Sequence, residues 1–182
     1  MIGGLGNQMF QYAMARSLAD HHNANLKLDL SDFEHYTLRR YELQDFNVRA
    51  EIAGREDLDS LKVRLRSYTL WQRMKRRILP DSPMVFRERS FAYNKEVHRI
   101  RPPVYLDGYW QSERYFASNI AVIRKDFTLN VPLDPSNTEM MAFIGSVNAV
   151  SLHVRRGDYI EDPNTNRFHG VCPIGYYNDA VT

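Results

Sequence analysis

Apolar side chains recur at helical spacing soon after a glycine-rich stretch at the start of the chain. Four of them, Phe10, Ala13, Met14 and Leu18, lie on one face of residues 8–22, and a period of about 3.6 residues is typical of an amphipathic helix. Asn7 precedes this stretch and is a candidate to cap its first turn. The next apolar segment, "LKLDL" at residues 26–30, alternates as a half-buried strand does. Helix followed by strand predicts a parallel crossover unit.

Shorter elements and frequent prolines follow in the second half of the chain. We expect a short strand near Tyr105, a helix from Ser112, and a linker at "NVPLDPSN", a polar stretch with two prolines. Beyond the linker, the pattern predicts a helix over residues 139–145, a buried strand at residues 149–154 and a helix that begins at Pro173. This alternation of helices and strands indicates an α/β fold with a domain boundary at the linker.

A basic stretch lies in the middle of the chain. Residues 60–80 carry seven lysines and arginines and no acidic residue. Wound as a helix, the stretch gathers five of them on one side: Lys62, Arg66, Arg73, Arg76 and Arg77. Two interpretations stay open: a helix that covers the core with its basic face in water, and a surface helix that binds anionic lipid. Arg64 and Lys75 interrupt the apolar side, which favours the first interpretation.

Composition limits the class of protein. The chain has 182 residues, of which 43% are hydrophobic and 25% charged, and this is ordinary for a globular protein. A net charge of +2 gives the whole chain no general affinity for nucleic acid. The single cysteine, Cys172, cannot form an intrachain disulfide, which indicates a reducing compartment. Because neither a membrane-spanning run nor a secretion signal is recognisable, we expect a cytoplasmic protein, with peripheral contact at the inner face of the membrane as an addition.

The segment "SLHVRRGDY", residues 151–159, joins a predicted strand end to a group of polar side chains. Ligands of open α/β sheets bind outside the carboxyl ends of the strands. Arg155 and Arg156 offer planar guanidinium groups that suit a diphosphate. Asp158 can orient an arginine or accept a hydrogen bond from a hydroxyl, and His153 shares a strand face with Arg155. The alternative is an ordinary charged loop in water.

A second candidate site is "GGLGNQ", residues 3–8. Glycines before a helix expose amide groups at its positive end, which attracts anions and hydroxyl-bearing ligands. The spacing differs from the dinucleotide-binding glycine motif, and no lysine follows the last glycine as it would in a phosphate-binding P-loop. The alternative is a tight turn with Asn7 as the helix cap.

Three motifs in order, "GGLGNQMFQYAMARSLA", "GYWQSERYF" and "SLHVRRGDY", resemble the bacterial alpha-1,2-fucosyltransferase family, glycosyltransferase family 11. The segments "RRYELQDFNV" and "HGVCPIGYYNDAV" are similar to that family as well, so the resemblance covers essentially the whole chain. It implies transfer of L-fucose from GDP-fucose to the 2-hydroxyl of a galactoside, with inversion and without a metal or other cofactor. The acceptor would be a galactose-containing glycan, as in the synthesis of O-antigen or lipopolysaccharide.

The implied fold is GT-B-like, with two α/β domains that face a cleft. Residues 1–135 would form the Rossmann-like, acceptor-side domain, and residues 136–182 would supply the opening strand and helix of the donor-binding domain. Members of the family begin with a full strand before the glycines and continue well past this length. We therefore expect the chain to be a fragment that is inactive alone.

The resemblance also assigns roles to individual residues. Arg155 would hold the donor diphosphate with support from Arg156 and Asp158, while His153 would contact the nucleotide side. Four residues of the glycine-rich stretch would line the cleft near the sugar: Gly4, Gly6, Asn7 and Gln8. The catalytic base stays open between Asp158 and His153. The alternatives are another nucleotide-sugar transferase and a basic module that binds membrane surfaces or nucleic acid.

Overall fold

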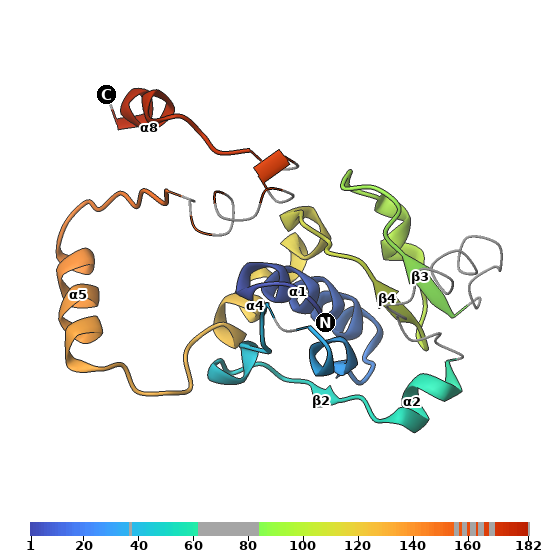
Figure 1. The fold of residues 1–182 in the computed structure, drawn as a ribbon. Coiled ribbons are helices and arrows are strands. Elements are labelled where there is room, and N and C mark those ends of the chain that lie inside the picture. The colour runs from blue at the N-terminus through green and yellow to red at the C-terminus, as the bar shows by residue number, and fades with distance from the viewer. Residues whose placement is uncertain are drawn as a thin grey trace. The chain divides into compact units, whose positions relative to one another are not determined.

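A computed structural model describes residues 1–36, 38–61, 84–154, 157, 160, 163, 166, 167 and 170–181 (Figure 1). The chain divides into two compact units, Met1–Pro132 and Leu133–Thr182, and each is described by itself. Most of the basic stretch predicted as a helix, residues 62–80, lies outside the described residues, so both interpretations of it stay predictions. The domain limits at residue 135 are likewise still a prediction.

Helix α1, Leu5–His22, is the central element of the first unit (Figure 1). Its buried face includes Tyr12 and Met14, which confirms the helix predicted from the apolar spacing. The prediction that Asn7 caps the helix is wrong, because the helix starts earlier than the apolar period indicates. Gly4 is the N-cap residue, with extended backbone, and its carbonyl accepts a hydrogen bond from the Gln8 N–H at 3.1 Å.

Two small parallel sheets follow this helix in the sequence. Strand β1, Lys27–Leu28, pairs with β2, Glu51–Ile52, and β3, Val85–Arg87, pairs with β4, Tyr105–Asp107. These pairings confirm an α/β arrangement with parallel strands and the strand expected near Tyr105. Strand β1 is shorter than the predicted residues 26–30, because β2 matches it over two residues only.

The remaining elements of the first unit are one-turn and two-turn segments. The helix expected from Ser112 is instead two 3₁₀ turns followed by an α-helix, because Phe116 has φ of −135°, outside the helical range. Its ring packs against Phe10 with the ring centroids 6.1 Å apart, which keeps Phe116 turned into the core. The elements are η1 Ser31–Glu34, η2 Leu43–Asp45, α2 Arg55–Ser60, η3 Lys95–Arg99, η4 Glu113–Tyr115, η5 Ala117–Asn119 and α4 Ile120–Asp126.

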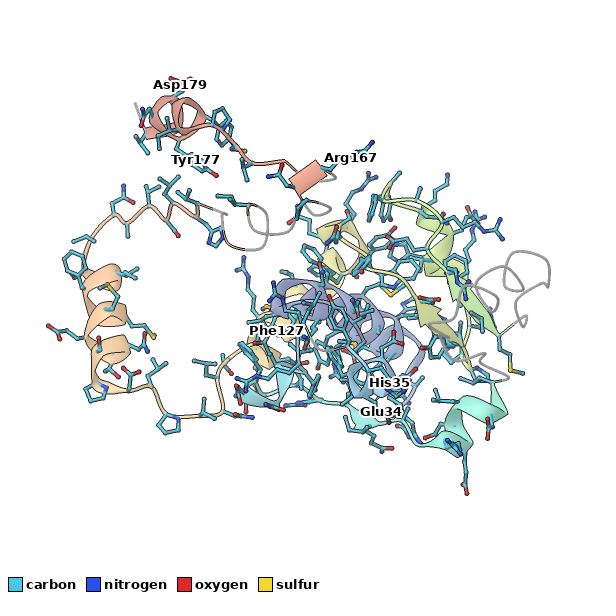
Figure 2. All side chains as sticks on the ribbon, in the orientation of Figure 1. Glu34, His35, Phe127, Arg167, Tyr177 and Asp179 are labelled. Atoms are coloured by element: carbon cyan, nitrogen blue, oxygen red, sulfur yellow. The ribbon has the colours of Figure 1, made fainter. Side chains whose placement is uncertain are left out.

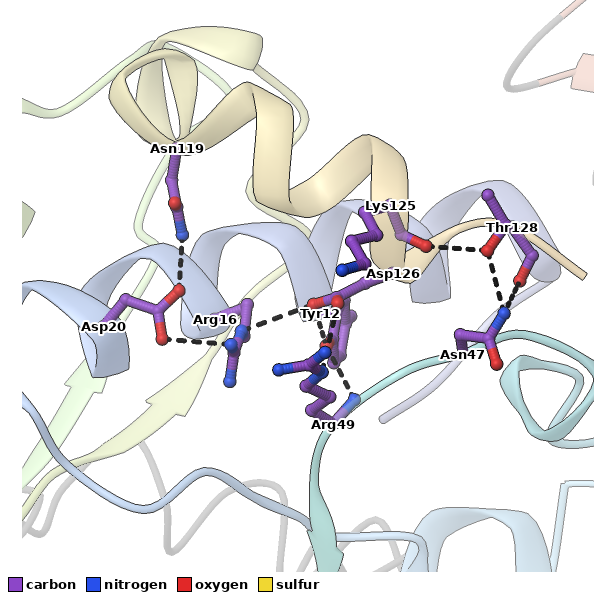
Figure 3. Close-up of polar contacts among 9 residues, drawn as sticks. All are labelled: Tyr12, Arg16, Asp20, Asn47, Arg49, Asn119, Lys125, Asp126 and Thr128. Carbon is purple, nitrogen blue, oxygen red and sulfur yellow. Dashed lines mark hydrogen bonds and ion pairs between the residues drawn. The ribbon is translucent and has the colours of Figure 1, made fainter. Parts of the chain in front are cut away.

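A cluster of polar and charged side chains around the buried Asp126 joins α1 to α4 (Figure 3). Asp126 is 1% exposed, and its Oδ2 accepts a hydrogen bond from the Tyr12 hydroxyl at 2.7 Å. Arg16 Nε lies 3.3 Å from the same oxygen, and Arg49 Nε lies 3.8 Å from Oδ1. The Tyr12 hydroxyl also accepts from the Arg49 N–H at 2.9 Å. Burial and the neighbouring Asp126 carboxylate raise the pKa of Tyr12, although the Arg49 hydrogen bond opposes them. We call Tyr12, Arg16, Arg49 and Asp126 the Asp126 cluster.

The second unit contains helices α5, Pro135–Ser146, and α8, Ile174–Val181. Both confirm predictions: α5 contains the helix expected at 139–145, and α8 begins directly after Pro173. Asp134 caps α5 by accepting from the Asn137 N–H at 2.8 Å, and this hydrogen bond lowers the pKa of Asp134. None of the described helices in either unit is long and apolar enough to cross a membrane.

The buried strand predicted at residues 149–154 is wrong. These residues form no strand and are exposed, with Val150 at 92% exposure. A buried strand needs neighbouring strands to satisfy its backbone groups, and the described part of the second unit provides none. Side chains crowd around α1 in the first unit, with Phe127 packed on Tyr12 at 5.6 Å between ring centroids, whereas α5 buries no residue (Figure 2).

Candidate functional site

The glycine turn, residues 3–8, meets the segment that follows β4. Gln111 Nε2 donates to Asn7 Oδ1 at 2.7 Å, which joins two stretches that are 104 residues apart in sequence. Both stretches lie where ligands are expected in parallel α/β proteins, one at the start of a helix and the other beyond the carboxyl end of a strand. The contact therefore marks a candidate functional site in the first unit.

Gln8 fixes the glycine turn to a neighbouring loop. Its side chain is 0% exposed, and its amide nitrogen donates to Gly3 O at 2.9 Å and to Arg40 O at 2.8 Å. Its amide oxygen accepts from the Glu42 N–H at 2.9 Å. Both N–H groups of the amide are thus used inside the protein. In this structure Gln8 positions the turn, and direct contact with a sugar stays a prediction.

The turn itself needs glycine at Gly3 and leaves space at Gly6. Gly3 has φ of +88°, and a Cβ there would lie 2.6 Å from Asn7 Nδ2. A Cβ on Gly6 would meet no atom within 4 Å, while one on Gly4 would lie 3.5 Å from Arg39 Nε. The first N–H groups of a helix have no partner within the helix. The positive end of α1, with a guanidinium beside Gly4, therefore favours an anion or a hydroxyl-bearing ligand.

Arg39 also lines a shallow hollow of about 520 Å³. Its walls come from η1 and the loop that Gln8 holds, and they combine aromatic rings with charged groups: Phe33, Tyr36, Arg39, Arg40, Tyr41 and Glu42. Aromatic faces and cations next to open amide groups can bind a sugar and its phosphate. The arginines of "RRYELQDFNV" belong to this site, although the sequence analysis assigned them no role.

Glu88, which directly follows β3, is a second residue that the sequence analysis missed. Its Oε2 accepts from the Tyr109 N–H at 2.7 Å and from the Trp110 N–H at 3.2 Å. Its Oε1 is buried and has no hydrogen-bond partner among the described residues. A Cβ on Gly108 would lie 2.4 Å from Glu88 Cβ, so this approach requires glycine. The sequence alone does not distinguish Glu88 from any other glutamate after a short strand, because its role in fixing the loop is visible only from its contacts.

Trp110 sits in an unusual backbone conformation at the same place. Its φ is 56°, a value that is rare for bulky residues and is often found at functional sites. The indole is 2% exposed and stacks on Phe86, with ring centroids 6.0 Å apart and an interplanar angle of 20°. Glu88 and this stacking hold "GYWQ" in the conformation that presents Gln111 to Asn7.

The predicted diphosphate site lies largely outside the described residues. Arg155, Arg156 and Asp158 are not among them, so their roles stay predictions. His153 is described and is exposed in a segment without regular structure. The structure thus brings Gly4, Gly6, Asn7 and Gln8 together, and says nothing of the contacts of the three residues that would hold GDP.

The chain contains one DxD triplet, Asp57–Leu58–Asp59 in α2, which the sequence analysis overlooked as a possible metal motif. Asp57 is already engaged: it accepts from Lys27 Nζ at 2.7 Å and from the Gly54 N–H at 2.9 Å. The Lys27 hydrogen bond lowers the pKa of Asp57. Across the described residues, no group of three or more His, Cys, Asp or Glu side chains is placed to hold a metal ion. A donor site without metal stays a prediction.

Parallel α/β pairing, an open positive helix end and an aromatic, basic hollow are features that suit an anion or a hydroxyl-bearing ligand. The model of the family described as Glycosyl transferase family 11 matches residues 1–182, and the chain belongs to that family. It is 31% identical over 188 residues to the alpha-1,2-colitosyltransferase of Escherichia coli. This alignment covers 100% of the chain and 61% of the relative.

A second relative is the O-antigen biosynthesis glycosyltransferase WbnK of Escherichia coli, 30% identical over 202 residues. This alignment covers 100% of the chain and 65% of the relative. The chain therefore spans less than two thirds of the length of both relatives. No solved structure matches it.

Proposed function

We propose that this chain is part of an inverting, metal-independent glycosyltransferase that moves L-fucose from GDP-fucose to the 2-hydroxyl of a galactoside. The observation that carries the proposal is the meeting of three family motifs at the glycine turn. Asn7 contacts Gln111 of "GYWQSERYF" at 2.7 Å, and Gln8 contacts Arg40 of "RRYELQDFNV" at 2.8 Å. Family membership across residues 1–182 supports the same function.

In the proposed reaction the acceptor oxygen attacks the anomeric carbon of fucose. A new carbon–oxygen bond forms while the bond from that carbon to the diphosphate breaks, and GDP departs with the bonding electrons. The acceptor hydroxyl gives its proton to a base, for which Asp158 and His153 are the candidates. Arg155, supported by Arg156, would stabilise the charge on the departing diphosphate in place of a metal ion. The glycine turn would face this reaction across a GT-B-like cleft.

Colitose is the second candidate for the transferred sugar. A relative that is 31% identical is named alpha-1,2-colitosyltransferase, which makes colitose the alternative to fucose in this proposal. GDP-fucose and GDP-colitose, each competed against labelled GDP-fucose for binding to the chain, would separate the two candidates. Stronger competition by GDP-colitose would replace fucose in the proposal.

The diphosphate assignment is tested at Arg155. We expect Arg155→Ala to weaken GDP binding by the chain at least tenfold in isothermal titration, and to abolish transfer in an enzyme of full length, because a charge-assisted bidentate contact is lost. Arg124→Ala is the matched control, since it removes the same charge from an exposed position on α4. Equal GDP affinity of the parent chain and Arg155→Ala, or near-normal turnover, would refute the assignment.

For location, we propose a cytoplasmic protein of O-antigen or lipopolysaccharide synthesis that makes peripheral contact with the inner face of the membrane. The basic residues of 60–80 support such contact through attraction to anionic lipid. Salt-sensitive pelleting with anionic vesicles tests it, and absence of pelleting at low salt argues against it. Binding to RNA or vesicles without any response to GDP would favour a basic binding module instead.

A further inference from the structure

A second hollow lies beside β3 in the first unit, and we call it the β3 hollow. Its volume is about 1060 Å³, close to the upper end of the roughly 300–1,000 Å³ that is usual for ligand pockets. The residues that line it are 85–90, 92–96, Trp110 and Arg114. Trp110 precedes Gln111, which donates to Asn7. The motif "GYWQSERYF" therefore lines this hollow and also contacts the glycine turn.

Glu88 fixes one wall of the β3 hollow. Its Oε2 accepts from the Trp110 N–H at 3.2 Å, and the neighbouring Arg87 has its Nε 2.9 Å from Asp107 Oδ2. Both side chains are thus held by the protein before any ligand arrives. Glu88 Oε1 is buried and has no hydrogen-bond partner among the described residues. A hydroxyl group that reaches this oxygen would gain a charged acceptor.

Basic side chains outnumber acidic ones in the lining. The two carboxylates are already in use, since Glu88 accepts from backbone N–H groups and Glu96 Oε2 lies 2.9 Å from Arg99 Nη1. Three cations of the lining are exposed and have no ion pair within the described residues: Arg89, Lys95 and Arg114. The walls therefore favour a ligand with negative charge.

Arg114 is the cation that the structure fixes most closely. Its guanidinium carbon lies 4.0 Å from the centre of the Tyr93 ring, a contact that attracts a cation to an aromatic face. The Tyr93 hydroxyl lies 2.9 Å from His98 Nε2, and its ring packs on Tyr115 with the centroids 4.9 Å apart. Because Arg114 contacts a ring instead of a carboxylate, its N–H donors stay available for a ligand carboxylate or phosphate.

Neutral polar groups beside these cations favour a sugar over a simple anion. Ser90 and Asn94 lie in the same walls, and hydroxyl and amide groups donate to and accept from sugar hydroxyls. Asn94 is held in place, because its N–H donates to the Tyr115 hydroxyl at 2.9 Å and its Oδ1 accepts from the Glu96 N–H at 3.0 Å. A sugar with one negative group would use both parts of the lining.

We propose that the β3 hollow binds an acidic sugar, which carries a carboxylate or a phosphate group, as part of the acceptor glycan. The negative group would contact Arg114, with Lys95 nearby. The sugar hydroxyls would contact Ser90 and Asn94. A neighbouring galactosyl residue would lie toward the glycine turn, because "GYWQSERYF" contacts both places. The role as acceptor rests on the proposed function, whereas the binding of an acidic sugar does not.

The test is an NMR titration of the chain with D-galacturonate, with D-galactose as the matched neutral sugar. The two sugars differ only in the carboxylate that replaces a hydroxymethyl group. We expect galacturonate to bind at least tenfold more tightly and to shift the backbone signals of Lys95 and Arg114, because it adds a charge-assisted contact. Galactose 6-phosphate is the second acidic sugar. The tighter of the two acidic sugars identifies the negative group that the hollow takes, and tighter binding of either than of galactose supports the proposal.

Variants of the lining locate the binding. Arg114→Gln should weaken galacturonate binding at least tenfold, because the bidentate contact is lost. Lys95→Gln should weaken it about threefold, because a flexible ammonium contributes as a point charge only. Arg124→Gln removes one positive charge from an exposed position on α4 and should bind like the parent chain.

Four outcomes would overturn the proposal. The first two are the same affinity for galacturonate and galactose, and no binding of either acidic sugar. The third is inorganic phosphate that binds as tightly as galactose 6-phosphate, because the hollow would then recognise an anion alone. The fourth is unchanged affinity in Arg114→Gln with loss of binding in Arg39→Gln, which would place the sugar in the other hollow.

These outcomes are separate from a failure of the proposed function. The titration contains no GDP-fucose, so its failure overturns the acidic-sugar site and leaves the proposed donor untested by that result. Absence of GDP-fucose binding would refute the proposed function, and galacturonate binding at Arg114 would be unaffected.

Discussion

The first unit contains two polar clusters that differ in whether both oxygens of their carboxylate are paired. In the Asp126 cluster, both carboxylate oxygens lie within 2.7–3.8 Å of Tyr12, Arg16 or Arg49. The other cluster, here called the turn cluster, comprises Asn7, Gln8, Glu88 and Gln111. It uses amides to fix loops, and it leaves Glu88 Oε1 with no partner in the described residues.

The difference distinguishes polar side chains that stabilise the fold from polar side chains that can contact a ligand. A buried charge with every oxygen paired stabilises the fold only through its partners, since losing one partner exposes a large desolvation cost. The turn cluster includes Asn7 and Gln8 at the start of α1, where the first N–H groups have no partner within the helix and a Cβ on Gly6 would meet no atom within 4 Å. We infer that the Asp126 cluster fixes α1, and that the turn cluster presents the start of α1 to a ligand.

Asp126→Asn should give the largest loss of stability. The asparagine leaves Arg16, whose side chain is 17% exposed, without its buried counter-charge, which costs about 3 kcal/mol in the free energy of unfolding. Urea unfolding at pH 7 measures it. Asp20→Asn is the control, because Asp20 pairs with Arg16 at 3.2 Å from a side chain that is 34% exposed, and such pairs contribute roughly 0–1 kcal/mol. Equal losses in the two variants would break the distinction between the clusters.

Gln8→Met should come second. The methionine fills similar volume but leaves Gly3 O, Arg40 O and the Glu42 N–H without their partner, at a cost of about 2 kcal/mol. The same urea titration measures the loss, and Gln44→Met, in an exposed side chain, should change stability by less than about 0.5 kcal/mol. A Gln8→Met variant as stable as the parent chain would mean that the glycine turn does not need the hydrogen bonds of the Gln8 side chain.

The sequence predicted the elements whose signal is local. Apolar spacing around Met14 and a proline before Ile174 were enough to predict α1 and α8, because both patterns depend on neighbouring residues in the chain. The glycines and Asn7 were recognisable as a candidate site for the same reason, and that assignment stays a prediction. The strand at 149–154 failed, since its apolar run depends on partner strands that the described part of the second unit does not contain.

The rest of the site could not be predicted from the sequence, because its residues are brought together by tertiary contacts. Glu88 is tied to Trp110 across 22 residues, and Gln8 to Arg40 across 32. No periodicity or spacing reports such pairs. Gln8 also shows the limit of the family resemblance: its role near a sugar stays a prediction, and its amide N–H groups are used within the protein.

The two tyrosines Tyr12 and Tyr105 should make the stability of the chain depend on pH above pH 10. Burial, with Asp126 nearby, raises the pKa of Tyr12 above its ordinary 10.0, and burial with Asp29 raises that of Tyr105. A raised folded-state pKa gives stability that is complete below pH 10 and is lost as the pH rises further. Each such tyrosine contributes a slope of about 1.4 kcal/mol per pH unit.

Tyr12→Phe removes one of these two groups. Urea unfolding between pH 8 and pH 11 should therefore show a smaller loss of stability per pH unit in Tyr12→Phe than in the parent chain. At pH 8 the variant should be about 1 kcal/mol less stable, because the hydrogen bond to Asp126 is gone. An unchanged slope above pH 10 would show that Tyr12 ionises as readily in the folded chain as in the unfolded one.

Glu88→Gln should give the smallest effect. The amide oxygen of glutamine can still accept from the Tyr109 and Trp110 N–H groups, and the nitrogen that replaces Oε1 breaks no existing hydrogen bond. We expect a loss of about 1 kcal/mol or less, the difference between a charged and a neutral acceptor. Urea unfolding of Glu88→Gln and Asp126→Asn under the same conditions tests this. If Glu88→Gln loses as much stability as Asp126→Asn, the Glu88 carboxylate also stabilises the fold, and the difference between the two clusters is refuted.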